Sequence, residues 1–113
     1  MNKPLHRFKA EFFKTLSHPL RLALLDALRD GERSVSQLQE ATNSDQSAIS
    51  QQLAVLRNKG FLEYRKEGTS VLYHVRDSQV YTFLDLGKAI FERQLQHSSD
   101  LLERFRAESV LSP

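Results

Sequence analysis

Residues Gln46–Arg57, with the sequence QSAISQQLAVLR, decide the fold because they predict a helix with two unlike faces. Ile49, Leu53 and Leu56 recur at intervals of four and three residues, which places them on one side of a helix. A helix that is apolar on one side packs that side against a core. The opposite side carries small or amide side chains and no acid: Ser47, Ser50, Gln51, Ala54 and Asn58. The stretch therefore predicts a helix over about 46–59 with a polar face open to a partner.

A shorter helix is predicted just before it. Ser34 and Gln37 have the spacing of a capping box, in which each side chain accepts a hydrogen bond from a free backbone N–H group. This box opens a helix that runs through about Ala41, and residues 42–45 form a turn cluster with N-cap residues for the next helix. Two helices joined by a short turn over 34–59 are the pattern of a helix-turn-helix.

Two short strands follow the helix-turn-helix. The patterns over 62–66 and 71–75 predict strands, and the turn 67–70, which contains Gly68, joins them as a hairpin. A helix-turn-helix followed by a hairpin over 62–75 predicts a winged helix-turn-helix. The fold class is therefore mainly α with a small β-hairpin.

Further helices are predicted on both sides of this unit. Apolar spacing predicts a first helix over 5–16, a second from Pro19 to Gly31, and a long last helix over 78–106. The length of 113 residues suits one domain over 1–113. So long an apolar stripe needs a second copy of the chain to cover it, and we expect a homodimer formed by the first and last helices. The candidate interface residues are Phe8, Phe12, Phe83, Ile90, Phe91 and Leu95.

The polar face of the helix over 46–59 suits contact with double-stranded DNA. A helix in the major groove needs side chains that are small or able to donate and accept hydrogen bonds at base edges, and glutamine can pair with adenine. The first turn of a helix also favours phosphate. Basic and hydroxyl side chains of the hairpin can reach phosphates. The candidate DNA-binding residues are Gln46, Ser47, Ser50, Gln51, Arg65, Lys66 and Thr69.

The alternative function is a winged-helix module that docks another protein. A docking face should present aromatic residues or leucine, whereas this face presents serine, glutamine and asparagine. An enzyme would need a nucleophile with a base, or paired carboxylates, and no G-x-S-x-G, P-loop or H-E-x-x-H motif occurs. We therefore expect no catalytic residues and a DNA-binding regulator.

The composition is that of an ordinary globular protein, with 40% hydrophobic and 27% charged residues and a net charge of +2. No apolar run approaches the roughly 20 residues of a membrane helix. The first residues lack the hydrophobic core of a signal peptide, so we expect a cytoplasmic protein without membrane contact. The absence of cysteine excludes disulfides and thiolate metal sites.

Four segments resemble the ArsR family of bacterial winged-helix repressors: LSHPLRLALL at 16–25, SVSQL at 34–38, QSAISQQLAVLR at 46–57 and GFL at 60–62. The match covers about residues 8–76. The resemblance implies a symmetric homodimer that binds an inverted-repeat operator and blocks transcription until an inducer arrives. A small molecule, a protein partner or no inducer at all remain open.

The chain departs from the metal-sensing members of that family. The resemblance places one family metal site on the stretch 34–37, where this chain has no cysteine. It places another on the last helix, where the earlier ligands would fall at Leu84 and Leu86, which cannot coordinate a metal. His97 and Asp100 keep only the later spacing, and a closed zinc site normally has four ligands. We therefore expect no metal and no cofactor.

Overall fold

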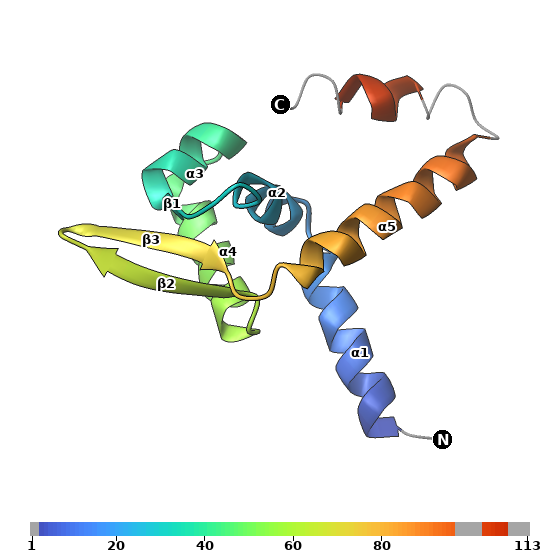
Figure 1. The fold of residues 1–113 in the computed structure, drawn as a ribbon, viewed down its shortest axis with the longest axis horizontal. Coiled ribbons are helices and arrows are strands. Elements are labelled where there is room, and N and C mark those ends of the chain that lie inside the picture. The colour runs from blue at the N-terminus through green and yellow to red at the C-terminus, as the bar shows by residue number, and fades with distance from the viewer. Residues whose placement is uncertain (1–2, 97–102, 109–113) are drawn as a thin grey trace. The chain divides into compact units, whose positions relative to one another are not determined.

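The computed structural model describes residues 3–96 and 103–108. Its elements in chain order are α1 (Lys3–Leu16), α2 (Pro19–Ala27), β1 (Arg33–Ser34), α3 (Val35–Thr42), α4 (Gln46–Asn58), β2 (Leu62–Glu67), β3 (Ser70–Val75) and α5 (Gln79–Leu95) (Figure 1). Contacts divide the chain into two compact units, Met1–Asp77 and Ser78–Pro113. The interpretation of 1–113 as one functional domain stays a prediction.

Side-chain caps begin the helices of the first unit. The N–H of Gln37 donates to Ser34 Oγ at 3.3 Å, and the N–H of Ser34 donates to Gln37 Oε1 at 2.9 Å, so the capping box is confirmed. At the start of α4, Asp45 Oδ1 accepts a hydrogen bond from the N–H of Ala48 at 2.8 Å. At the start of α2, His18 Nδ1 accepts a hydrogen bond from the N–H of Leu20 at 3.2 Å. Each cap satisfies a backbone donor that the helix itself leaves free.

The core of the first unit is built mainly of leucine. The predicted stripe of Ile49, Leu53 and Leu56 is fully buried, at 0% exposure for each side chain. The burial of one such side chain stabilises a fold by about 1.5–3 kcal/mol. The rest of this core comes from α1, α2, α3 and the segment that leads into β2: Leu16, Leu24, Leu25, Leu28, Leu38, Phe61 and Leu62. The polar face of α4 therefore points out of the molecule, as predicted.

The strands form a three-stranded antiparallel sheet in the order β1-β3-β2, within the residues that the structure describes. Both predicted strands are confirmed, and Gly68 adopts a φ of +62° in the turn between them, a conformation that glycine accommodates best. The hairpin of β2 and β3 is long and projects beyond α4 (Figure 1). β1 was not predicted, because a strand of two residues has no periodicity. It pairs Arg33 with Tyr73 and Ser34 with Leu72.

The last helix is shorter than the sequence predicted. The structure ends α5 at Leu95, with Gln96 as its C-cap, and helical residues return at 103–108. A single helix over 78–106 is therefore wrong. The sequence after Gln96 contains Ser98, Ser99 and Asp100, types that compete for backbone hydrogen bonds and favour caps over helix interiors.

Replacing the cap of α4 tests how far local hydrogen bonding holds this helix. We expect Asp45→Ala to lower the free energy of unfolding by about 1 kcal/mol, because the N–H of Ala48 loses its acceptor. The neighbouring variant Ser44→Ala is the control, since the one hydrogen bond of the Ser44 hydroxyl within the described residues is a long one, to the carbonyl of Thr42 at 3.4 Å. Urea denaturation followed by circular dichroism measures both. Equal stability of the two variants would contradict the cap.

Candidate nucleic-acid interface

The outward face of α4 is polar and exposed. The four candidate DNA-binding residues of this helix are all solvent-exposed: Gln46, Ser47, Ser50 and Gln51. Ala54 and Asn58 of the same helix are exposed as well. The whole of α4 carries no acidic side chain. A surface of hydroxyl and amide groups without negative charge can approach a polyanion and can hydrogen-bond to base edges. The structure brings these predicted residues together on one surface.

A polar bridge ties α4 to the first two helices. Arg21, on α2, donates from Nε to Gln52 Oε1 at 2.8 Å and from Nη1 to the carbonyl of Thr15 at 3.1 Å. Gln52 is half-buried on α4, and Thr15 lies in the last turn of α1. One guanidinium therefore connects α1, α2 and α4. The contact of Arg21 with Gln52 was not predicted, because the two residues lie 31 positions apart in the chain.

The two faces of the wing, the hairpin of β2 and β3, differ in charge. Successive residues of a strand point to opposite faces, so Arg65 and Lys66 do not share one. The face that we call the acidic wing face carries Glu63, Arg65 and Glu67 of β2. The face that we call the basic wing face carries Tyr64 and Lys66. The candidate wing residues therefore divide between two surfaces.

The basic wing face continues the exposed face of α4. Leu62 belongs to the same side of β2 and is buried in the core at 2% exposure. The guanidinium of Arg57, near the end of α4, lies 5.2 Å from the ring centroid of Tyr64, within the range of a cation–π contact. Arg57 follows Ser50 by two helical turns, so both lie on one side of α4. The surface thus runs from Ser50 through Arg57 to Lys66.

Arg65 is bound by two carboxylates. Its Nε donates to Glu32 Oε2 at 2.9 Å, and its Nη2 donates both to Glu32 Oε1 and, at 2.8 Å, to Glu67 Oε2. The hydrogen bond to Arg65 is the main reason that the pKa of the Glu32 carboxyl is lowered. The hydrogen bonds that Arg65 donates, chiefly to Glu32 and then to Glu67, raise the pKa of its guanidinium. Lys66 and Thr69 are exposed, and no carboxylate among the described residues binds either side chain.

The role of Glu32 was not predicted, because Glu32 lies 33 positions before Arg65 in the chain. The two strands that flank β3 bring these residues together. Ser34 of β1 and Arg65 of β2 both pair with Leu72, so the chain just before β1 lies across β3 from Arg65. The alternation of side chains along β2 would have predicted from sequence that Arg65 and Lys66 lie on opposite faces of the wing.

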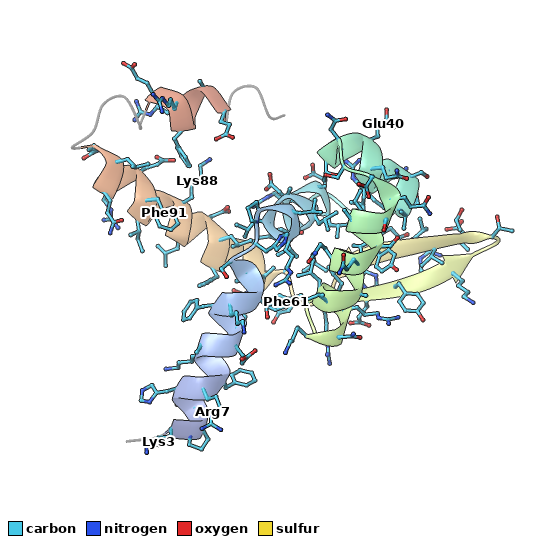
Figure 2. All side chains as sticks on the ribbon, turned by 180° about the vertical axis from the view of Figure 1, so that it is seen from behind. Lys3, Arg7, Glu40, Phe61, Lys88 and Phe91 are labelled. Carbon is cyan, nitrogen blue, oxygen red and sulfur yellow. The ribbon has the colours of Figure 1, made fainter. Side chains whose placement is uncertain are left out.

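A groove of about 520 Å³ runs beside α1. Phe61 lies next to this helix (Figure 2), with its ring centroid 5.2 Å from that of Phe12. Phe8 also lines the groove and is 71% exposed. Lys59 forms an ion pair with Glu11 at the rim, with 3.6 Å between Nζ and Oε2. The exposed aromatic surface of α1 is where the sequence predicts a subunit contact.

Within residues 3–96 and 103–108, no three His, Asp or Glu side chains gather as a metal site. His97 and Asp100, the remaining family ligand positions, lie outside the described residues. No described helix combines the length and the apolar character that crossing a membrane requires. The expectation that the protein needs no metal stays a prediction.

Comparison with known proteins identifies the family. The model for bacterial regulatory proteins of the arsR family matches residues 18–64. The transcriptional regulator Rv0081 of Mycobacterium tuberculosis, of the helix-turn-helix type, is 36% identical over 107 residues, which cover 94% of each chain. The chain belongs to the ArsR family. The crystal structure of Rv0081 agrees with this ArsR chain at a TM-score of 0.78 and 35% identity, covering 85% of this chain and 97% of that one.

Two more relatives of this ArsR protein bear on its fold and function. The biofilm growth-associated repressor of Xylella fastidiosa is 37% identical over 82 residues, covering 73% of this chain and 72% of that one. A homodimeric winged helix-turn-helix DNA-binding domain from Mycobacterium bovis matches at a TM-score of 0.72 and 31% identity, covering 83% of this chain and 87% of that one. The predicted fold is confirmed. The protein is a transcriptional regulator with a winged helix-turn-helix DNA-binding domain.

The bridge of Arg21 predicts a measurable cost on its removal. We expect Arg21→Leu to lower the free energy of unfolding by about 1–3 kcal/mol, because half-buried acceptors on Gln52 and Thr15 lose their donor. Arg76→Leu is the matched control, since Arg76 forms an exposed ion pair with Glu63, and such pairs contribute at most about 1 kcal/mol. Urea denaturation separates the two. A larger loss for Arg76→Leu would contradict the bridge.

Proposed function

We propose that this regulator is a repressor that binds an inverted-repeat operator as a homodimer. The observation that carries the proposal is the continuous surface from the acid-free face of α4 through Arg57 to Lys66. A helix-turn-helix protein places its second helix in the major groove, and a wing beside it reaches the flanking backbone. The named activity of the Xylella fastidiosa relative supports repression. The protein acts in the cytoplasm by binding DNA and catalyses no reaction.

The residues of this surface divide by role. Ser47, Ser50 and Gln51 read bases, because they project from the middle of the polar face of α4. Lys66 and Arg57 bind phosphates and supply affinity that does not depend on sequence. Gln46 lies at the helix start and Thr69 in the turn of the wing, where both donate to phosphate.

The apolar faces of α1 and α5 support a homodimer. Phe8 of α1 is 71% exposed, and on α5 Ile90 and Phe91 are 41% and 59% exposed. Phe13 and Leu86, which sequence analysis did not name, are exposed at 55% and 63%. Exposed apolar surface of this extent on a small protein marks an interaction site. The homodimeric relative from Mycobacterium bovis supports a second copy of the chain as the occupant.

In the proposed homodimer, the groove beside α1 forms part of the interface between the two chains. Phe8 and Phe12 line the groove and are also candidate interface residues, so a partner chain that packs on α1 covers both.

Two substitutions separate base reading from phosphate binding. We expect Gln51→Ala to weaken binding to the operator by about 1–3 kcal/mol and to relax preference at one base pair per half-site. Lys66→Ala should weaken operator and random DNA alike and reduce the salt slope by up to about one for each protomer. Mobility-shift titrations at several salt concentrations measure both variants. A reversed pattern contradicts the roles, and no binding of wild type to any duplex favours the protein-docking alternative.

The dimer is tested by mass in solution. We expect sedimentation equilibrium at micromolar concentration to give twice the chain mass of 13.0 kDa. Phe91→Glu should shift the protein toward the monomer, because it places a charge in an apolar interface. Arg93→Gln changes the net charge by the same amount on the same exposed helix and should remain dimeric. A wild-type monomer, or equal effects of both variants, would contradict the interface.

A further inference from the structure

On the acidic wing face, carboxylates bind the guanidinium of Arg65, which could otherwise contact a DNA phosphate. Arg65 lies close to Lys66 in sequence, on a wing that the proposed function places beside DNA, yet its guanidinium is occupied by Glu32 and Glu67. Glu32 comes from the loop before β1, outside both the helix-turn-helix and the wing. This inference rests on the proposed function, because it concerns how the wing meets phosphate.

The contact of Arg65 with Glu32 and Glu67, which we call the clamp, has good hydrogen-bond geometry but contributes little to the free energy. Both carboxylate oxygens of Glu32 accept from Arg65, through Nε and Nη2, which is the paired arrangement that favours arginine with a carboxylate. The side chains of Arg65 and Glu32 remain 49% and 35% exposed, so water screens their attraction. A phosphate can therefore compete for Arg65, but it must first displace two carboxylates. The clamp lowers the share of Arg65 that is available to DNA without abolishing it.

The sheet makes the clamp effective. Arg65 extends over β3 toward β1, because Glu32 is reached across the strand that lies between β1 and β2. That face is opposite the one that Tyr64 turns toward Arg57 of α4. The clamp thus keeps the Arg65 guanidinium away from the surface that includes α4, while Lys66 stays on that surface.

The geometry points to Glu32 as a positioning residue that limits the affinity of this regulator for DNA of any sequence. By accepting hydrogen bonds from the Arg65 guanidinium, together with Glu67, Glu32 keeps one phosphate contact per protomer largely unused. Because a phosphate contact carries no base information, its release raises affinity for operator and random DNA equally. A lower affinity for random DNA leaves more of the protein free to find its operator.

The test compares salt dependence on a random-sequence duplex for the full chain. Glu32→Ala should bind more tightly than wild type and lose more affinity as salt rises. One added phosphate contact makes the loss between 50 and 200 mM salt about 3.5-fold larger, so two in a dimer make it up to about twelvefold larger. Glu67→Ala, which removes the other carboxylate, should change in the same direction.

Two controls isolate the action through Arg65. Asp30→Ala removes the same charge from the same loop, and Asp30 has no hydrogen-bond or ion-pair partner in the part of the chain that the structure describes. It should leave the salt slope unchanged. In an Arg65→Ala background, Glu32→Ala should also leave the slope unchanged, because the cation that it releases is gone. A merely structural role of Glu32 would not produce this dependence on Arg65.

The outcomes separate this inference from the proposed function. Tighter, more salt-sensitive binding by Glu32→Ala that vanishes without Arg65 establishes the positioning role. Weaker or unchanged binding, an equal effect of Asp30→Ala, or persistence of the effect without Arg65 overturns it while DNA binding by wild type stands. Failure of wild type to bind any duplex overturns the proposed function, and this inference with it.

Discussion

The burial of one stripe of α4 is the constraint on which the rest of the structure depends. Ile49, Leu53 and Leu56 are inaccessible to water, and together they fix the rotation of α4 about its own axis. A turn of the helix by one residue, about 100°, would move these side chains toward water and bring serine or glutamine into the core, where a polar group without a partner is costly. The polar face of α4 is exposed because the opposite, apolar face packs into the core.

Hydrophobic burial is not directional, so other interactions must set where α4 begins and how it is oriented against its neighbours. Asp45 fixes the start through one hydrogen bond to the backbone. Arg21 adds a directional tie from the side, since its planar guanidinium satisfies acceptors on α1 and α4 together. The exposed polar surface of α4 therefore rests on a core that sets the rotation of the helix and on polar contacts that set its position.

Sequence alone was enough for features that depend on local spacing. The stripe of α4, the capping box at Ser34 and the hairpin around Gly68 each follow from residues within a few positions of one another, and the structure confirms them. The end of α5 at Leu95 was missed because the apolar periodicity of the sequence continues past that residue, to Leu101 and Phe105. Contacts across many positions, such as that of Arg21 with Gln52, leave no periodic trace in one sequence.

The wing shows why a list of basic residues does not define a DNA-binding surface. Arg65 and Lys66 are neighbours with the same charge, and strand alternation alone sends them to opposite faces. Glu63 and Glu67 share the face of Arg65, and the fold adds Glu32 from a distant loop, so that face is acidic in sum. Lys66 shares its face with Tyr64 and is joined there by Arg57. Strand parity thus separates the two cations of β2, leaving Lys66 on one face of the wing and Arg65 bound by carboxylates on the other.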